Sequence, residues 1–362
     1  MVPNTENDHQ ENALRFAVLQ NLYYSGRRDE FDNGLKQWRA EAPKSPFTRY
    51  LQAIVARHQL APKSMWARDY ESGLECGLRH PAPPAHVKRW DGSHAGSRSI
   101  TVWAEEGLGD FVRHARHIPS IKEYCDEVVV HVPQKILPLI QNSFPECRIT
   151  SSHEDAIKSD FHVASGSLDG FFWAAKSNPQ SSGYLSAQAS EGAAAADPKT
   201  LKVGVCSRST KLAWDRDSNY TNLAALSPIF QSERFECHSL QYTYDDKEIM
   251  AANRAFSRPV ISYPQFDFFN DITTLSNIIV SLDMVIATST LVADLAAALG
   301  VKTWRFHAIP GQKLISGANN SDILDISDPN PGRSWYGNCT TIAYRGEQDT
   351  WDDFFAAVAS HL

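Results

Sequence analysis

Residues 99–119 read SITVWAEEGLGDFVRHARHIP, and this stretch decides the fold. Residues 100–103 form a β-branched and aromatic run typical of a buried strand, and Gly107 and Gly109 interrupt it before a segment with helical spacing begins. A strand, a glycine turn and a helix in this order place backbone N–H groups and a helix dipole at the carboxyl edge of a parallel sheet. Open α/β folds bind their ligands at that edge.

The turn carries three acidic residues, Glu105, Glu106 and Asp110. Carboxylates near a helix N-terminus interact favourably with the helix dipole, so helix capping and acceptor binding are both open for Glu105 and Glu106. Asp110 stands between the second glycine and the helix, and this position suits a general base.

The region before this turn reads as helical. Segments 12–24, 28–41, 47–59 and 64–78 carry apolar residues at spacings of three and four, and glycine and proline separate them. We expect an all-helical segment over residues 1–85 that resembles a degenerate tetratricopeptide repeat and ends at a proline-rich linker. Such a segment is either a docking surface or a cap on the next domain.

Beyond residue 97, strands and helices alternate along the chain. This order predicts an α/β fold with two Rossmann-like domains, one over residues 86–190 and one over residues 191–362, each built on a parallel sheet. A stretch rich in serine, glycine and alanine, residues 178–198, reads as the connection between them. Two such domains imply a cleft between them.

Composition narrows the class of protein. The chain has 362 residues, of which 42% are hydrophobic and 21% charged, and its net charge of −7 argues against nucleic acid as the main partner. The N-terminus carries no visible secretory signal, and the most apolar stretch, residues 278–301, contains two aspartates and makes a poor transmembrane segment. Six scattered cysteines read as reduced thiols, so we expect a cytoplasmic protein. The histidines and cysteines lack metal-ligand spacing, so we expect no metal site.

Four motifs in order carry a resemblance. They are WDGSHAGSRSITVWAEEGLGDFVRHARHIP (90–119), VGVCSRSTKLAWDRDSNYTNL (203–223), ECHSLQYTYDDKEI (236–249) and LDMVIATSTLVADLAAALGVKTWR (282–305). Together they resemble bacterial tetratricopeptide-associated glycosyltransferase-like proteins, which are related to the ADP-heptose lipopolysaccharide heptosyltransferases of glycosyltransferase family nine. The similarity runs from about Trp90 to the C-terminus.

The resemblance implies a glycosyltransferase of the B type (GT-B). It would move a sugar from a nucleotide-diphosphate sugar, bound in the C-terminal domain, to a protein or glycan acceptor in the N-terminal domain, with inversion and without a metal or other cofactor. Asp110 matches the family's catalytic aspartate, and the final helix, residues 350–361, is expected to cross back onto the first domain. The expected donor contacts are Arg208, Lys211, Arg216, Gln241, Thr288, Ser289, Thr290 and Asp294. The expected acceptor contacts are Glu105, Glu106, Gly107, Gly109, Arg113 and Arg116.

Alternatives remain for some of these residues. Arg113, His114, Arg116 and His117 form either an anion-binding cluster or a solvated helix face. Asp294 stands where some relatives have histidine, and an acid repels a diphosphate unless it bonds to a neighbouring group. Glu106 replaces the relatives' glutamine. These two departures favour a second hypothesis, a catalytically inactive binding or assembly protein with the same fold.

Overall fold

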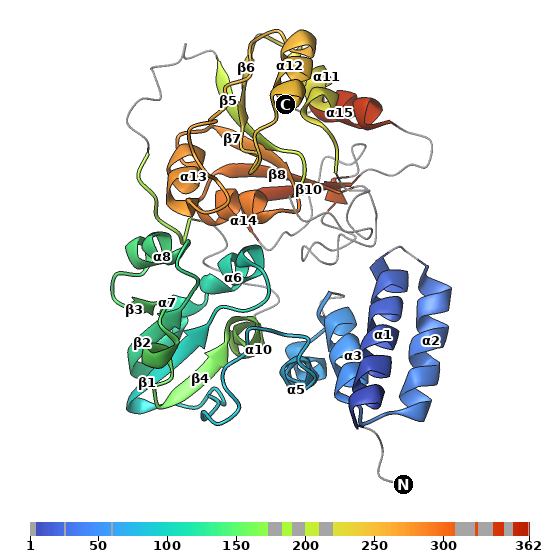
Figure 1. Cartoon of the computed structure of the whole chain (residues 1–362), viewed down its shortest axis with the longest axis vertical. Coiled ribbons are helices and arrows are strands. Elements are labelled where there is room, and N and C mark those ends of the chain that lie inside the picture. The colour runs from blue at the N-terminus through green and yellow to red at the C-terminus, as the bar shows by residue number, and fades with distance from the viewer. Residues whose placement is uncertain are drawn as a thin grey trace.

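The computed structural model describes residues 5–24, 27–58, 61–172, 183–189, 200–209, 220–307, 323–324, 336–343, 350–360 and 362. Within these residues the chain forms a helical segment, a first α/β unit and a second α/β unit (Figure 1). The sequence prediction of an α/β fold with parallel sheets is confirmed. Most of the expected connection at 178–198 lies outside the described residues.

The helical segment precedes both sheets. Its helices are α1 (Thr5–Tyr24), α2 (Arg28–Glu41), α3 (Pro46–His58), α4 (Ala67–Tyr70) and α5 (Ser72–Glu75), with a 3₁₀ turn at Lys63–Met65. Phe47, Tyr50, Leu51 and Ile54 of α3 follow helical spacing and are buried in the segment's own core. The single helix predicted over residues 64–78 is instead three short pieces.

The first α/β unit holds a four-stranded parallel sheet in the order β3-β2-β1-β4. The strands are β1 (Gly96–Trp103), β2 (Cys125–His131), β3 (Arg148–Thr150) and β4 (Phe161–Ala164). The helices are α6 (Leu108–Ala115), α7 (Ile118–Ile121), α8 (Leu137–Ser143), α9 (His153–Ala156) and α10 (Leu168–Phe172). The last four residues of β1 are all buried, as expected for an inner strand covered on both faces.

The second α/β unit holds a six-stranded parallel sheet in the order β6-β5-β7-β8-β10-β9. The strands are β5 (Leu201–Cys206), β6 (Phe235–Ser239), β7 (Met284–Thr288), β8 (Lys302–His307), β9 (Ile323–Leu324) and β10 (Cys339–Ala343). The helices are α11 (Ser227–Phe230), α12 (Asp246–Ala255), α13 (Ile272–Ile279), α14 (Leu291–Ala298) and α15 (Trp351–Ala359), with a 3₁₀ turn at Leu223–Leu226.

The two α/β units pack directly on each other through α6 and α14 (Figure 1). One apolar cluster is continuous across this boundary and contains Val112 of α6 together with Ala293 and Ala296 of α14, all without exposed surface. The alanines of α14 let the two helices approach closely.

The final helix differs from its prediction. Phe354, Phe355 and Val358 of α15 lie in the core of the second unit, and α15 packs against α11 there (Figure 1). The expectation that this helix crosses onto the first domain is therefore wrong. The apolar face of this amphipathic helix packs against the core of the second unit instead.

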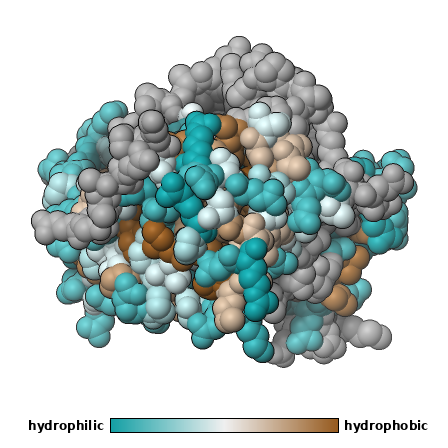
Figure 2. Space-filling model, turned by 90° about the horizontal axis from the view of Figure 1, so that it is seen from above, coloured by the Kyte–Doolittle hydropathy of each residue, from teal (hydrophilic) through white to brown (hydrophobic). Residues whose placement is uncertain are grey.

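The described helices include none that is long and apolar enough to cross a membrane. Viewed from the side of the second unit, the described surface mixes hydrophobic residues with hydrophilic ones and shows no single apolar face (Figure 2).

Candidate functional site

The turn after β1 lies where parallel sheets bind ligands. Because β1 sits between β2 and β4, the strand order reverses between β1 and β4, and open α/β sheets bind their ligands outside the carboxyl ends of the strands at such a point. Residues 104–107, after β1, and residues 165–167, after β4, flank this point.

Glu105 forms a buried ion pair at this edge of the sheet. Its carboxylate accepts hydrogen bonds from the Arg79 Nε (3.1 Å) and from the Gly166 backbone N–H (2.7 Å), and its side chain has no exposed surface. Arg79, at the end of the helical segment, is also fully buried and donates to Ser167 Oγ at 2.9 Å. Glu105 therefore joins the helical segment to the first α/β unit, and neither helix capping nor an open acceptor contact describes it.

Glu106 keeps part of its surface exposed to solvent, while its carboxyl group lies among protein atoms. Its backbone φ is 58°, a left-handed conformation that residues other than glycine rarely adopt. Its backbone N–H donates a hydrogen bond to His80 O at 2.7 Å. The Tyr50 hydroxyl of α3 donates to Glu106 Oε1 at 3.2 Å. Burial among surrounding protein atoms, together with the charges of Asp110 and Glu105, raises the pKa of Glu106 to about 7.

Asp110 caps its own helix and still reaches solvent. Its Oδ2 accepts a hydrogen bond from the Gly107 backbone N–H at 3.2 Å, and its Oδ1 lies 3.5 Å from Arg113 Nη1. About a third of the Asp110 side chain, 33%, stays exposed. The geometry is thus compatible with both a capping role and a general base.

The basic residues at the end of α6 are all buried, so the prediction of a solvated helix face is wrong. They are Arg113, His114, Arg116 and His117. Buried Asp169 of α10 forms ion pairs with Arg116 and with Arg57 of α3, and the rings of His114 and His117 contact the same carboxylate. Burial lowers the pKa of His114 to about 4, which leaves it neutral at pH 7. Arg116 therefore contributes to the junction with the helical segment rather than to an open anion site.

Asp294 forms the centre of a second network, between the two α/β units. Its Oδ1 accepts hydrogen bonds from Arg305 Nη2 (2.6 Å) and from the Tyr336 hydroxyl (3.0 Å), and it lies 3.6 Å from Arg113 Nη2. A Cβ on Gly109 would come within 2.8 Å of Asp294 Oδ2, so this glycine is required for the close approach of α6 and α14. Two arginines therefore neutralise the acid that the sequence placed beside the donor phosphates.

The residues expected at the donor phosphates are engaged with one another. Arg208 forms an ion pair with Glu248 of α12, and Gln241 Oε1 accepts from the Ser207 N–H (2.8 Å) while its Nε2 donates to Arg208 O (2.9 Å). Thr288 and Thr290 are buried, and Ser289 is half-buried at the start of α14. Lys211 and Arg216 lie outside the described residues.

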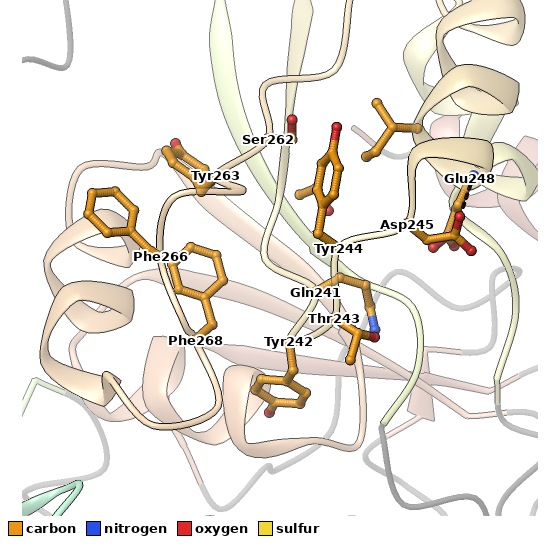
Figure 3. A pocket seen from close by; sticks show the side chains of 12 residues that line it. Gln241, Tyr242, Thr243, Tyr244, Asp245, Glu248, Ser262, Tyr263, Phe266 and Phe268 are labelled. Atoms are coloured by element: carbon orange, nitrogen blue, oxygen red, sulfur yellow. Dashed lines mark hydrogen bonds between the residues drawn. The ribbon is translucent and has the colours of Figure 1, made fainter.

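An aromatic pocket opens beyond β6 in the second unit (Figure 3). Its lining consists of Ser239, Gln241, Tyr242, Thr243, Tyr244, Asp245, Glu248, Ile249, Ser262, Tyr263, Phe266 and Phe268. Tyr242 extends from this pocket towards α14, where its hydroxyl lies within hydrogen-bonding reach of Thr290 and of the Val292 backbone. The pocket is therefore connected to the first turn of α14.

Several residues of these sites were not predicted. Glu248 lies within the third sequence motif and Arg305 within the fourth, so the motifs could have identified both residues as site candidates. Tyr50 and Arg79 lie in the helical segment, where nothing local distinguishes them from packing residues. Within the described residues, no group of three or more histidine, cysteine, aspartate or glutamate side chains could hold a metal ion.

Comparison with known proteins gives distant similarities. No protein-family model matches the chain. Protein FlbA of Caulobacter vibrioides is 22% identical over 236 residues, which are 59% of this chain and 40% of FlbA. The chain thus spans well under two thirds of the length of this curated relative.

The solved structures with similar folds include heptosyltransferases. ADP-heptose lipopolysaccharide heptosyltransferase II of E. coli is 10% identical and has a TM-score of 0.44, covering 72% of this chain and 98% of its own. A family 9 glycosyltransferase of Veillonella parvula is 8% identical with a TM-score of 0.46, over 76% and 96%. The iron-containing glycosyltransferase TibC of enterotoxigenic E. coli is 10% identical with a TM-score of 0.40, over 75% and 67%. What the site can do follows from its own residues.

Proposed function

We propose that this chain is a glycosyltransferase that moves a sugar from a nucleotide-diphosphate sugar to a hydroxyl of a protein or glycan acceptor. One observation carries the proposal. A continuous series of contacts runs from the aromatic pocket through Tyr242 to the first turn of α14, and from Asp294 of α14 to Gly109, next to Asp110. Along this series of contacts, a nucleoside site would come first, then a phosphate site, and then a carboxylate that meets the acceptor hydroxyl.

The donor would lie along this path. Tyr244 and Tyr263 offer flat faces on which a base would stack, and Gln241 lies near Tyr244 as a polar contact to base or ribose (Figure 3). The diphosphate would then meet the backbone N–H groups at Ser289 and Thr290, with Arg208 nearby, because a helix N-terminus favours an anion. Lys211 and Arg216 are proposed as further phosphate contacts.

Asp110 would face the reacting end of the donor. A carboxylate within hydrogen-bonding reach of the acceptor hydroxyl assists its attack on the anomeric carbon, and direct displacement by that hydroxyl inverts the configuration. Positive charge and N–H donors at the phosphates would stabilise the departing diphosphate without a metal. A cytoplasmic location and docking of the acceptor by the helical segment belong to the same proposal.

A panel of nucleotides and nucleotide sugars in a thermal-shift assay tests donor binding. A bound donor at 100 times its dissociation constant stabilises the folded chain by about 2.7 kcal/mol. Replacing Tyr244, a pocket residue, by alanine should weaken binding by the value of one stacked base, about 1–3 kcal/mol. The matched control is Phe269→Ala, because Phe269 is equally exposed and near the pocket but does not line it. Equal losses in the two variants would contradict this placement of the nucleoside.

Asp110→Asn tests the carboxylate itself. Asparagine keeps the size and caps the helix about as well, so donor affinity should stay within a few fold. Slow hydrolysis of the donor by water should fall by roughly a hundredfold or more. An unchanged rate of hydrolysis would leave Asp110 with the capping role alone.

A second candidate function is a binding or assembly protein without activity. The ion pairs that already occupy Asp294 and Arg208 favour it, because protein groups satisfy charges that a donor would otherwise meet. No thermal shift with any nucleotide or nucleotide sugar would select this second function.

A further inference from the structure

The carboxylates around the turn after β1 differ in whether they form an ion pair with arginine. Four of them are paired with arginine: Glu105 with Arg79, Asp110 with Arg113, Asp169 with Arg57 and Arg116, and Asp294 with Arg305 and Arg113. Glu106 has no ion pair among the residues that the structure describes, although it lies beside this network. The single described hydrogen bond of its side chain is the one that Tyr50 donates to Oε1, so Oε2 is left to solvent or to a ligand.

Glu106 differs from its neighbour Glu105 in burial and in backbone conformation. Glu105 is buried, whereas Glu106 is exposed and has a left-handed backbone conformation. The hydrogen bond from its N–H to His80 O holds this conformation. Strained residues of this kind gather at functional sites.

Both oxygens of Asp110 already have partners. Its Oδ2 accepts the hydrogen bond from the Gly107 N–H, and its Oδ1 lies 3.5 Å from Arg113 Nη1. Oε2 of Glu106 has no such partner among the described residues.

We propose that Glu106 is the group that receives the proton of the acceptor hydroxyl, while Asp110 orients that hydroxyl. This inference rests on the proposed glycosyl transfer and refines the part given to Asp110. The hydroxyl oxygen forms a bond to the anomeric carbon as the bond from that carbon to the diphosphate oxygen breaks. The electron pair of the broken bond leaves with the nucleoside diphosphate, and the proton of the hydroxyl moves to Glu106 Oε2.

The charged and titratable groups facing Glu106 come from four parts of the chain. Asp110 of α6 and Glu105 in the turn oppose its ionisation, and Arg57 of α3 and Arg79 after α5 favour it. The balance, with burial, sets its pKa at about 7, where a carboxylate is a more effective base near neutral pH than at its ordinary value. Tyr50 of α3 supports the ionised form by donating to Oε1, so the helical segment contributes directly to the site.

The test is the pH dependence of donor hydrolysis, with the nucleotide sugar that gives the largest thermal shift in a panel of UDP-, ADP-, GDP- and dTDP-sugars. In the unmodified chain kcat should rise with pH through about 7, as Glu106 ionises. Glu106→Gln should remove this rise and lower kcat about a hundredfold, with donor affinity unchanged. Tyr50→Phe should move the rise to higher pH, because loss of the hydroxyl destabilises the ionised carboxylate.

Glu123→Gln is the matched control, since Glu123 is an exposed glutamate away from the turn and its replacement should change nothing. A Glu106→Gln variant that keeps both the rate and the pH dependence of the unmodified chain would overturn the role of Glu106 and leave glycosyl transfer standing. If the unmodified chain hydrolyses none of these donors, glycosyl transfer itself fails, and the role of Glu106 fails with it.

Discussion

Replacement of Glu106 by glutamine should change stability in a way that depends on pH. The carboxyl has an ordinary pKa of 4.5, which we take for the unfolded chain, and a pKa of about 7 in the folded chain. The folded state therefore holds the proton more tightly between these values. Below pH 4.5 the raised pKa of Glu106 makes its full contribution to the free energy of unfolding. This contribution is lost as the pH rises through about 7.

The size of the effect follows from this difference in pKa. At 1.36 kcal/mol per pKa unit, the full difference corresponds to about 3 kcal/mol. Because Glu106 is open to water on one side, solvent screening reduces it, and we expect roughly 1 kcal/mol. Glutamine is neutral at every pH and can still accept the hydrogen bond from Tyr50. Glu106→Gln should therefore match the unmodified chain at pH 4.5 and be more stable by about 1 kcal/mol at pH 8.

Urea unfolding followed at several pH values between 4.5 and 8 measures this difference. Glu123→Gln, which makes the same chemical change at an exposed site, should show no pH-dependent difference. A Glu106→Gln variant that is less stable than the unmodified chain at pH 8 would refute the reasoning, because it would show that the folded state prefers the ionised carboxylate.

Three further predictions concern the packing around the site. Gly109→Ala should destabilise the chain by about 1–3 kcal/mol in urea unfolding, because the new methyl group meets a carboxylate oxygen that is held by ion pairs; no loss would show that α6 and α14 are not in close contact. Glu105→Gln should cost about 3 kcal/mol, because buried Arg79 then keeps only the partly exposed Glu71 as a counter-charge, and a loss below 1 kcal/mol would contradict the burial of the Glu105–Arg79 pair. Phe355→Ala should cost about 3–5 kcal/mol if α15 belongs to the core of the second unit, and a small loss would place the helix elsewhere.

The parts of the fold that the sequence predicted are those decided by local pattern. The runs at residues 100–103 and 284–287 are apolar on both faces, and both became inner strands of parallel sheets. The final helix shows the limit of this reasoning. Its amphipathic pattern predicts an apolar partner but does not say which one, and the expectation taken from resemblance was wrong.

The candidate site was predictable in position and less so in its contacts. The glycine turn located Asp110 and Glu106 at the sheet edge. The pattern could not reveal that Arg79 and Tyr50, more than 25 residues earlier in the sequence, would bond to the two glutamates. It also could not reveal that the acid at position 294 is neutralised, because Arg305 and Arg113 reach it only through the tertiary fold.

The close packing of α6 on α14 has a consequence for how a ligand would enter and leave. Domains joined by a small polar interface open and close freely, whereas a large apolar interface holds them together. Here the two α/β units share one continuous apolar cluster, and Gly109 touches Asp294 without room for a methyl group. The pair should therefore behave as one rigid body, and the rates of ligand binding and release would not depend on a hinge between the two units.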